Sequence, residues 1–210
     1  MTSEAQIPEH DTLSDLIRFF RAWLSDPLRV AAIIPSGVAL ANAMTREISI
    51  ATGPVLELGA GTGVFTRGLI ARGIPEDQLM LVESGSDFAE LLQLRFPRAH
   101  TLRIDATRIR DVALSGQEGA GAVVSGLPLL SMPPRKVIAI LDGAFSHLRP
   151  GGAFCQFTYG PRCPVPRTVL DRLGLKAARI GGTMANLPPA SVYRIRRRPP
   201  PAFSVRMKAT

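Results

Sequence analysis

The residues of this sequence that point most directly to chemistry are three glycines at alternating positions. Gly59, Gly61 and Gly63 close the segment VLELGAGTG (residues 55–63), whose first four residues have the pattern of a buried strand. A strand that leads into a glycine loop lets the backbone approach a bound nucleoside closely, because glycine has no side chain. A dinucleotide loop, G-x-G-x-x-G, needs a glycine at position 64, where this chain has Val64. The loop is therefore not predicted to cradle a pyrophosphate.

Carboxylates accompany this loop and the two strand-like segments after it. Glu57 lies two residues before the first glycine, where it can orient the loop or receive an ammonium group. Glu83 follows Gly63 by twenty residues, at the place where an acid accepts from both ribose hydroxyls. Asp105 follows the next strand and can accept from an adenine amino group, although a helix cap is its alternative role. This register predicts an S-adenosylmethionine site formed by Glu57, Gly59, Ala60, Gly61, Thr62, Gly63, Glu83, Ser84, Asp105, Ala106 and Ser125.

The elements that must hold these residues alternate between strand and helix patterns from residue 55 onward, as in a parallel sheet covered on both faces. We predict strands near Val55–Leu58, Leu79–Glu83, Thr101–Ile104, Gly121–Ser125, Ala153–Thr158, Leu175–Ile180 and Val192–Arg196. The predicted helices are near Phe65–Arg72, Ser86–Arg95, Arg135–His147 and Pro166–Leu173, with turns at Gly116–Gly121 and Arg149–Gly152. The expected fold class is therefore doubly wound α/β, with a mostly parallel, seven-stranded, Rossmann-like methyltransferase sheet.

The last two predicted strands are separated only by residues 181–190, which are too few for a helical crossover. They should therefore be antiparallel neighbours, with the last strand reversed. The loop between them begins at the carboxyl end of a parallel strand, which is the edge where open α/β sheets bind ligands.

The first fifty residues carry helical patterns and are predicted to form an N-terminal helical extension (1–50), followed by the methyltransferase domain (51–198) and a proline-rich tail (199–210). Thr12 and Asp15 fit a capping box for a first helix over about residues 12–25, which has one apolar face. Ser36 is the expected N-cap of a second helix that reaches about Ile48.

Composition narrows the class of partner. A formal charge of +8 and a pI near 10.7 indicate a polyanionic partner, for which nucleic acid and an anionic membrane are both candidates. The sequence has no apolar run long enough to span a bilayer and no pattern of a secretion signal, so the expected location is cytoplasmic. Cys155 and Cys163 suggest neither a disulfide framework nor a zinc site, and no metal is expected.

Taken together, several blocks resemble the class I methyltransferases and, more narrowly, the soluble bacterial phospholipid N-methyltransferases that methylate phosphatidylethanolamine. The resemblance covers most of the chain. It rests on IIPSG (33–37), VLELGAGTGVFT (55–66), LVESGSDFA (81–89), SGLPLLSMP (125–133), FTYGP (157–161) and NLPPASVYRIRR (186–197). The blocks are also similar to those of rRNA adenine dimethyltransferases, which usually have Asn-Leu-Pro-Phe or Asn-Leu-Pro-Tyr after the fourth strand. This chain has Gly126-Leu127-Pro128-Leu129 there. Leu129 cannot stack on a flipped base, which argues against a nucleobase acceptor.

The resemblance implies where the methyl acceptor binds. Backbone carbonyls of the turn Ser125, Gly126 and Leu127 would face a nitrogen acceptor and stabilise the positive charge that grows on it. Tyr159 could offer its ring face to the same ammonium, with a sheet-edge residue as the alternative role. The residues placed near the ligand edge to hold a headgroup are Arg162, Asn186, Tyr193 and Arg194.

The first helix could rest on a membrane. Phe20, Trp23 and Leu24 lie on its apolar face, with Arg18 and Arg21 off that face, a pattern that suits shallow insertion. Docking of this helix on its own domain is the alternative. The first functional hypothesis is stepwise N-methylation of phosphatidylethanolamine to phosphatidylcholine by a protein bound peripherally to the inner face of the cytoplasmic membrane, with no nucleic-acid partner. An rRNA adenine N-methyltransferase and a non-catalytic basic membrane-binding protein are the alternatives.

Overall fold

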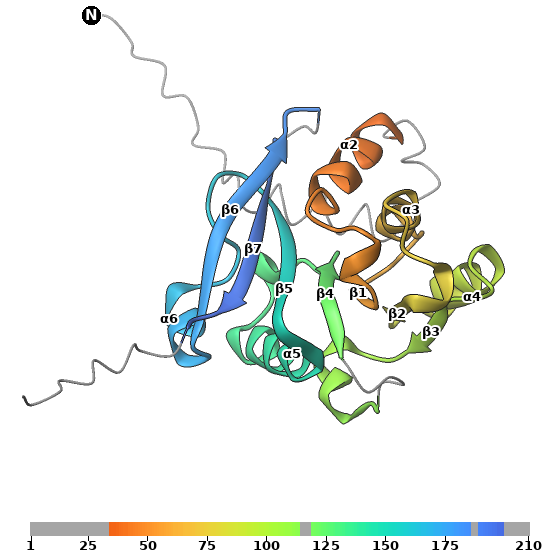
Figure 1. Ribbon diagram of the computed structural model, residues 1–210. Coiled ribbons are helices and arrows are strands. Elements are labelled where there is room, and N and C mark those ends of the chain that lie inside the picture. Colours follow the sequence, from red (N-terminus) through yellow and green to blue (C-terminus); the bar gives the residue numbers. More distant parts are fainter. Residues whose placement is uncertain (1–33, 114–118, 186–188, 200–210) are drawn as a thin grey trace, which may run out of the picture.

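A seven-stranded sheet organises the protein, with the strand order β3-β2-β1-β4-β5-β7-β6 (Figure 1). The computed structural model describes residues 34–113, 119–185 and 189–199. The strands are β1 (Val55–Leu58), β2 (Leu79–Glu83), β3 (His100–Arg103), β4 (Ala120–Ser125), β5 (Leu148–Tyr159), β6 (Leu175–Thr183) and β7 (Ala190–Arg197).

The pairing confirms the predicted fold class. Strands β1 to β5 are parallel to one another, whereas β7 runs antiparallel to both β5 and β6. The short connection between β6 and β7 forces this reversal, as its length predicted. All five parallel strands therefore end at one edge, the carboxyl edge, and the β6–β7 turn lies at that edge as well.

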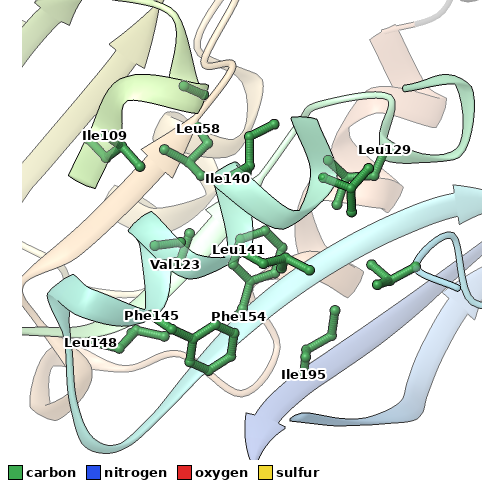
Figure 2. Packing of buried hydrophobic residues seen from close by; sticks show 14 of the residues in the cluster. Leu58, Ile109, Val123, Leu129, Ile140, Leu141, Phe145, Leu148, Phe154 and Ile195 are labelled. Atoms are coloured by element: carbon green, nitrogen blue, oxygen red, sulfur yellow. The ribbon is translucent and has the colours of Figure 1, made fainter. Parts of the chain in front are cut away.

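Helices cover both faces of the sheet (Figure 1). The helices α2 (Ile34–Met44), α3 (Val64–Ala71) and α4 (Ser86–Arg95) contribute to one apolar core, and α5 (Pro134–His147) and α6 (Arg167–Arg172) to the other. Figure 2 shows this second core, in which Phe154 of β5 packs between Leu141 and Phe145 of α5 and Ile195 of β7. The described residues also form 3-10 segments at Ile50–Thr52, Glu76–Gln78, Ala106–Asp111 and Leu129–Ser131. None of the helices within the described ranges is long and apolar enough to cross a membrane.

Several predicted boundaries are wrong, and the largest differences lie at the start of β5 and in the second helix. Arg149–Gly152 is not a turn, because β5 begins at Leu148 and pairs there with Ala120 across a register shift. The Pro-Gly-Gly sequence that suggests a turn is instead accommodated by the bulge, with Gly151 at a φ of +81°. The second helix begins at Ile34 rather than after Ser36, since proline at position 35 suits a first helical turn, where its missing N–H is not needed.

Helix α2 also ends earlier than the sequence predicts, at Met44 instead of Ile48. The Thr45 N–H still donates to the Ala41 carbonyl at 3.0 Å, but the next bond is tighter, because the Ile48 N–H donates to the Thr45 carbonyl, three residues back, at 3.0 Å. The helix packs on the domain, where Ala41 would lie 3.3 Å from a Cβ placed on Gly68 of α3.

Candidate active site

The glycine loop between β1 and α3 forms the centre of the carboxyl edge. Gly59, Gly61 and Gly63 have φ angles of +68°, +53° and +77°, in the left-handed region that disfavours side chains. The Gly59 N–H donates to the Val82 carbonyl of β2 at 2.8 Å, which fixes the start of the loop against the neighbouring strand. The predicted alternation of glycines is thus required by the backbone itself.

One side of this loop is closed and the other is open. A Cβ on Gly59 would lie 2.7 Å from the Leu127 side chain, and one on Gly63 would collide with the Phe96 ring. A Cβ on Gly61 would meet no atom within 4 Å. The space over Gly61 is where a nucleoside can approach the backbone, so the loop fits S-adenosylmethionine.

Glu83 joins the glycine loop to the end of β2. One of its carboxylate oxygens accepts from the Gly61 N–H and the other from the Gly85 N–H, both at 2.9 Å. Each carboxylate oxygen retains a second lone pair for a ribose hydroxyl. Ser84, the next residue, is exposed at the same edge. Glu83 therefore lies where the sequence predicts a ribose-binding acid.

Glu57 is completely buried beneath the loop. Its Oε2 accepts from the Thr66 hydroxyl of α3 at 2.7 Å, while its Oε1 is buried without a hydrogen-bond partner among the described residues. Burial raises the pKa of this carboxyl to about 8. Two roles were predicted for Glu57, orienting the loop and receiving an ammonium group. The bond to Thr66 supports the first role, because it fixes the first turn of α3 directly after the loop.

Asp105 caps the 3-10 segment that follows β3. Its Oδ1 accepts from the backbone N–H of Thr107 at 2.9 Å and from the Thr107 hydroxyl at 2.8 Å. These bonds lower the pKa of the carboxyl below its usual range. The residue is exposed, whereas the adjacent Ala106 is buried. The structure thus gives Asp105 the alternative role of a cap and leaves the carboxylate accessible at the ligand edge.

The turn after β4 packs directly on the glycine loop. Gly126 donates its N–H to the Leu58 carbonyl at 2.8 Å, and a Cβ at this position would lie 2.7 Å from the Gly59 carbonyl oxygen. The hydroxyl of Ser125, fully buried, accepts from the Leu127 N–H at 3.3 Å. The structure therefore brings the predicted acceptor turn and the predicted cofactor loop together.

The carbonyl of Leu127 corrects one expectation. Its oxygen accepts from the Leu129 N–H and from the Gln156 side-chain amide, both at 2.9 Å. Because a carbonyl oxygen has two lone pairs, this oxygen is filled and cannot also face an acceptor amine. No hydrogen bond from a described residue ends on the carbonyl of the neighbouring Gly126.

An aromatic row leads from the cofactor loop to the end of β5. The ring of Phe65, in the first turn of α3, lies 5.8 Å from that of Phe157, which lies 5.7 Å from the ring of Tyr159. Both contacts have edge-to-face geometry, which favours aromatic pairs. Tyr159 is half-buried and reaches the carboxyl edge, where the sequence predicted it.

The predicted headgroup residues separate into two groups. Arg162 is exposed in the loop after β5, and Asn186 lies outside the described residues. Tyr193 and Arg194 lie inside β7, and of these two only Tyr193 reaches a loop of the ligand edge, the loop after β5. The Tyr193 hydroxyl donates to the Pro161 carbonyl, and Arg194 forms a 2.7 Å ion pair with Glu47. The positions predicted to contact a membrane, Arg18, Phe20, Arg21, Trp23 and Leu24, also lie outside the described residues.

Two residues at the site were not predicted. Thr66 binds Glu57, and Gln156 binds the turn after β4. Gln156 had a signal in the sequence, because it is the polar residue inside the apolar run AFCQF of a buried strand. Thr66 had none, since a threonine in a first helical turn is common.

Comparison with known proteins places this geometry among methyltransferases. The chain is 30% identical over 154 residues to an ornithine lipid N-methyltransferase of Singulisphaera acidiphila, covering 71% of this chain and 80% of the relative. A second relative, ribosomal RNA small subunit methyltransferase A of a Synechococcus species, is 36% identical over 97 residues, which cover 44% of this chain and 31% of the relative. No protein-family model matches the chain.

Solved structures share the fold at low sequence identity. The glycopeptide N-methyltransferase MtfA complexed with S-adenosyl-L-methionine superposes with a TM-score of 0.57 at 15% identity, covering 77% of this chain and 94% of that one. The 1,6-didemethyltoxoflavin-N1-methyltransferase of Burkholderia thailandensis gives a TM-score of 0.59 at 16% identity, covering 94% of each chain. These likenesses support the Rossmann-like methyltransferase fold.

Proposed function

The chain belongs to the class I S-adenosylmethionine-dependent methyltransferases, and on this premise we propose that it methylates the amino group of a membrane lipid. The proposed substrate is phosphatidylethanolamine, with its mono- and dimethyl forms, on the route to phosphatidylcholine. The observation that carries the lipid class is the 30% identity to an ornithine lipid N-methyltransferase across most of both chains. Ornithine lipid is therefore the second candidate substrate. Its amine, like that of phosphatidylethanolamine, must be neutral before it can accept a methyl group.

Different residues of the carboxyl edge are proposed to bind different parts of the methyl donor. The cofactor supplies an electrophilic methyl group on a sulfonium centre. The loop from Gly59 to Gly63 would hold the cofactor against the backbone, Glu83 would accept from its ribose hydroxyls, and Asp105 would accept from its adenine amino group. Ser84 and Ala106 border the same space.

The acceptor amine is held by the turn that touches this loop. The Gly126 carbonyl points partial negative charge at the nitrogen, which becomes positive as the methyl group arrives. The ring face of Tyr159 stabilises the same charge. Leu127 and the aromatic row keep water out, which lowers the pKa of the amine and favours its reactive, neutral form. The released proton passes to water, and no dedicated base is required.

Action at a membrane surface is supported by apolar side chains at the same edge. Leu130 follows β4 and is 45% exposed, and Met184 follows β6 and is 83% exposed. Exposed Arg162 lies on the loop after β5, the strand beside β4 in the sheet. Large apolar groups flanking a cation suit the boundary between lipid headgroups and acyl chains. We place the protein peripherally at the inner face of the cytoplasmic membrane.

An RNA adenine acceptor is the competing function, supported by the second relative and by the net charge of +8. The turn disfavours it. The adenine enzymes that this chain resembles carry asparagine where Gly126 stands, and a Cβ there would lie 2.7 Å from the Gly59 carbonyl oxygen. An asparagine side chain has no room in this arrangement.

Methyl transfer from labelled S-adenosylmethionine tests these alternatives directly. The protein is incubated with phosphatidylethanolamine vesicles, ornithine lipid vesicles and structured RNA in separate reactions. We expect label in lipid, and the more rapidly labelled lipid identifies the headgroup. Label in RNA alone would refute the lipid proposal, and label in none would leave only the non-catalytic alternative.

A further inference from the structure

Gln156 is a buried polar residue that binding of the donor does not use. It lies in β5 directly beside Ser125 of β4, and it is 1% exposed. Phe154, two residues earlier on the same face of the strand, is fully buried in the apolar core (Figure 2). An amide at this depth calls for a physical reason, because buried polar groups destabilise a fold unless they are paired.

The partners of the amide fix its orientation. Its Nε2 donates to the Leu127 carbonyl and to the Phe157 carbonyl, both at 2.9 Å. Rotating the amide by half a turn would set its oxygen against these two carbonyl oxygens, which repel it. Its Oε1 is buried without a hydrogen-bond partner among the described residues. The amide therefore holds two backbone oxygens while one of its own atoms stays unsatisfied.

The bond to Leu127 determines which oxygen of the turn is available. With the Leu129 N–H as the second donor, the Leu127 carbonyl is filled and the turn is held at both ends. The neighbouring Gly126 carbonyl receives no hydrogen bond from the described residues and lies next to the glycine loop. A methionine at 156 would fill a similar volume but has no N–H donor. It could therefore not bind the Leu127 carbonyl and leave the Gly126 carbonyl free.

We infer that Gln156 is a positioning residue that locks the Leu127 carbonyl and thereby aims the Gly126 carbonyl at the acceptor amine. This inference rests on the proposed function in one respect, since it takes the turn after β4 as the acceptor site. It assigns no contact between Gln156 and either substrate.

Two substitutions separate positioning from folding. Gln156→Met removes both donors. Gln156→Glu replaces one atom, and it removes both donors while the new carboxyl is ionised but only one when it is protonated. Gln93→Met and Gln93→Glu, at an exposed position of α4, are the matched controls. Each protein is assayed with labelled S-adenosylmethionine and vesicles of phosphatidylethanolamine or ornithine lipid, and amide hydrogen exchange is followed over residues 126–132.

We expect Gln156→Met to lower kcat by about 10-fold to 100-fold, as for a misplaced reacting group, while the lipid KM and the cofactor Kd change less than about twofold. Exchange over 126–132 should quicken. In Gln156→Glu, kcat relative to the native protein should recover as the pH falls, because the protonated carboxyl regains one donor. This recovery keeps the test valid if Gln156→Met fails to fold.

Native kcat in Gln156→Met, or unchanged exchange over residues 126–132, would overturn the inference. So would a Gln156→Glu variant whose kcat keeps a constant ratio to that of the native protein across the pH range. If the native protein labels neither lipid, the proposed function fails, and the exchange measurement still decides whether Gln156 holds the turn.

Discussion

Glu83 is the residue in which donor binding and loop structure are combined. Its two carboxylate oxygens accept from the N–H groups of Gly61, in the glycine loop, and Gly85, just after β2. A charged acceptor makes stronger hydrogen bonds than a neutral one. Removing the carboxylate should therefore leave the ribose hydroxyls of the cofactor without their acceptor, and it should also loosen the glycine loop.

Glu83→Ala should weaken S-adenosylmethionine binding by about 1.5–3 kcal/mol, the range for hydrogen bonds to a charged group. Isothermal titration calorimetry measures the change in Kd. Glu90→Ala, at an exposed position of α4, is the control and should bind like the native protein. Native affinity in Glu83→Ala would show that this carboxylate does not contact the cofactor.

Glu57 makes the stability of the fold depend on pH. Burial raises its pKa from 4.5 to about 8, so between these values the folded protein holds a proton that the unfolded chain has lost. The free energy of unfolding should therefore decrease as the pH rises through this window, by about 1.4 kcal/mol per pH unit from this group. Below pH 4.5 the stabilisation is complete, and above pH 8 it is lost.

Glu57→Gln should remove this dependence, because the amide resembles the protonated carboxyl at every pH. Denaturant unfolding from pH 5 to 9 without cofactor gives the difference between variant and native protein, in which all other titrating groups cancel. That difference should shift in favour of the variant as the pH rises. A difference independent of pH, like that expected for the exposed Glu90→Gln, would show that Glu57 is ionised in the fold.

At the scale of elements, the bounds of strands and helices were predicted best where the local sequence alone determines them. Strands β1 and β2 and helix α4 have the predicted bounds, because each has a continuous apolar or helical pattern ended by a glycine, a charge or a phenylalanine. The start of β5 was missed because residues 149–152 form a bulge between the pairs Ala120–Leu148 and Ala122–Ala153, and they belong to the strand only because β4 pairs on both sides of them. Such pairing depends on residues about 30 positions away, which no local pattern encodes.

The same limit applies to the site. The donor residues were predictable because the loop and its acids follow successive strands. The position of Tyr193 and Arg194 inside β7 was not predictable, because it is set by the register that pairs Tyr159 of β5 with Ala190 of β7. Gln156 was visible as a polar residue in an apolar strand, but its partner Leu127 comes from the neighbouring strand.

The two connections at the carboxyl edge that carry Leu130 and Met184 should act together on a membrane. Replacing both residues with serine removes exposed apolar surface, and neither residue belongs to the buried core, so we expect folding to be unchanged. We expect clearly weaker sedimentation with phosphatidylethanolamine vesicles. Leu94→Ser is the matched control, since Leu94 is 81% exposed near the far end of α4. Equal losses in both proteins would mean that this edge does not face the bilayer.

At the scale of the whole molecule, donor binding and membrane binding should be separable. The donor residues all lie between Glu57 and Ser125, whereas the apolar and basic pattern that suits a membrane lies in residues 12–25. Deleting residues 1–25 should impair sedimentation with anionic vesicles while leaving the cofactor Kd within about twofold of the native value. For the full chain, the net charge of +8 adds an electrostatic attraction to these vesicles, so its sedimentation should weaken as rising salt screens that attraction. If the shortened protein sediments like the full chain, the membrane contact belongs to the domain itself. If it loses the cofactor as well, the first helix belongs to the donor site.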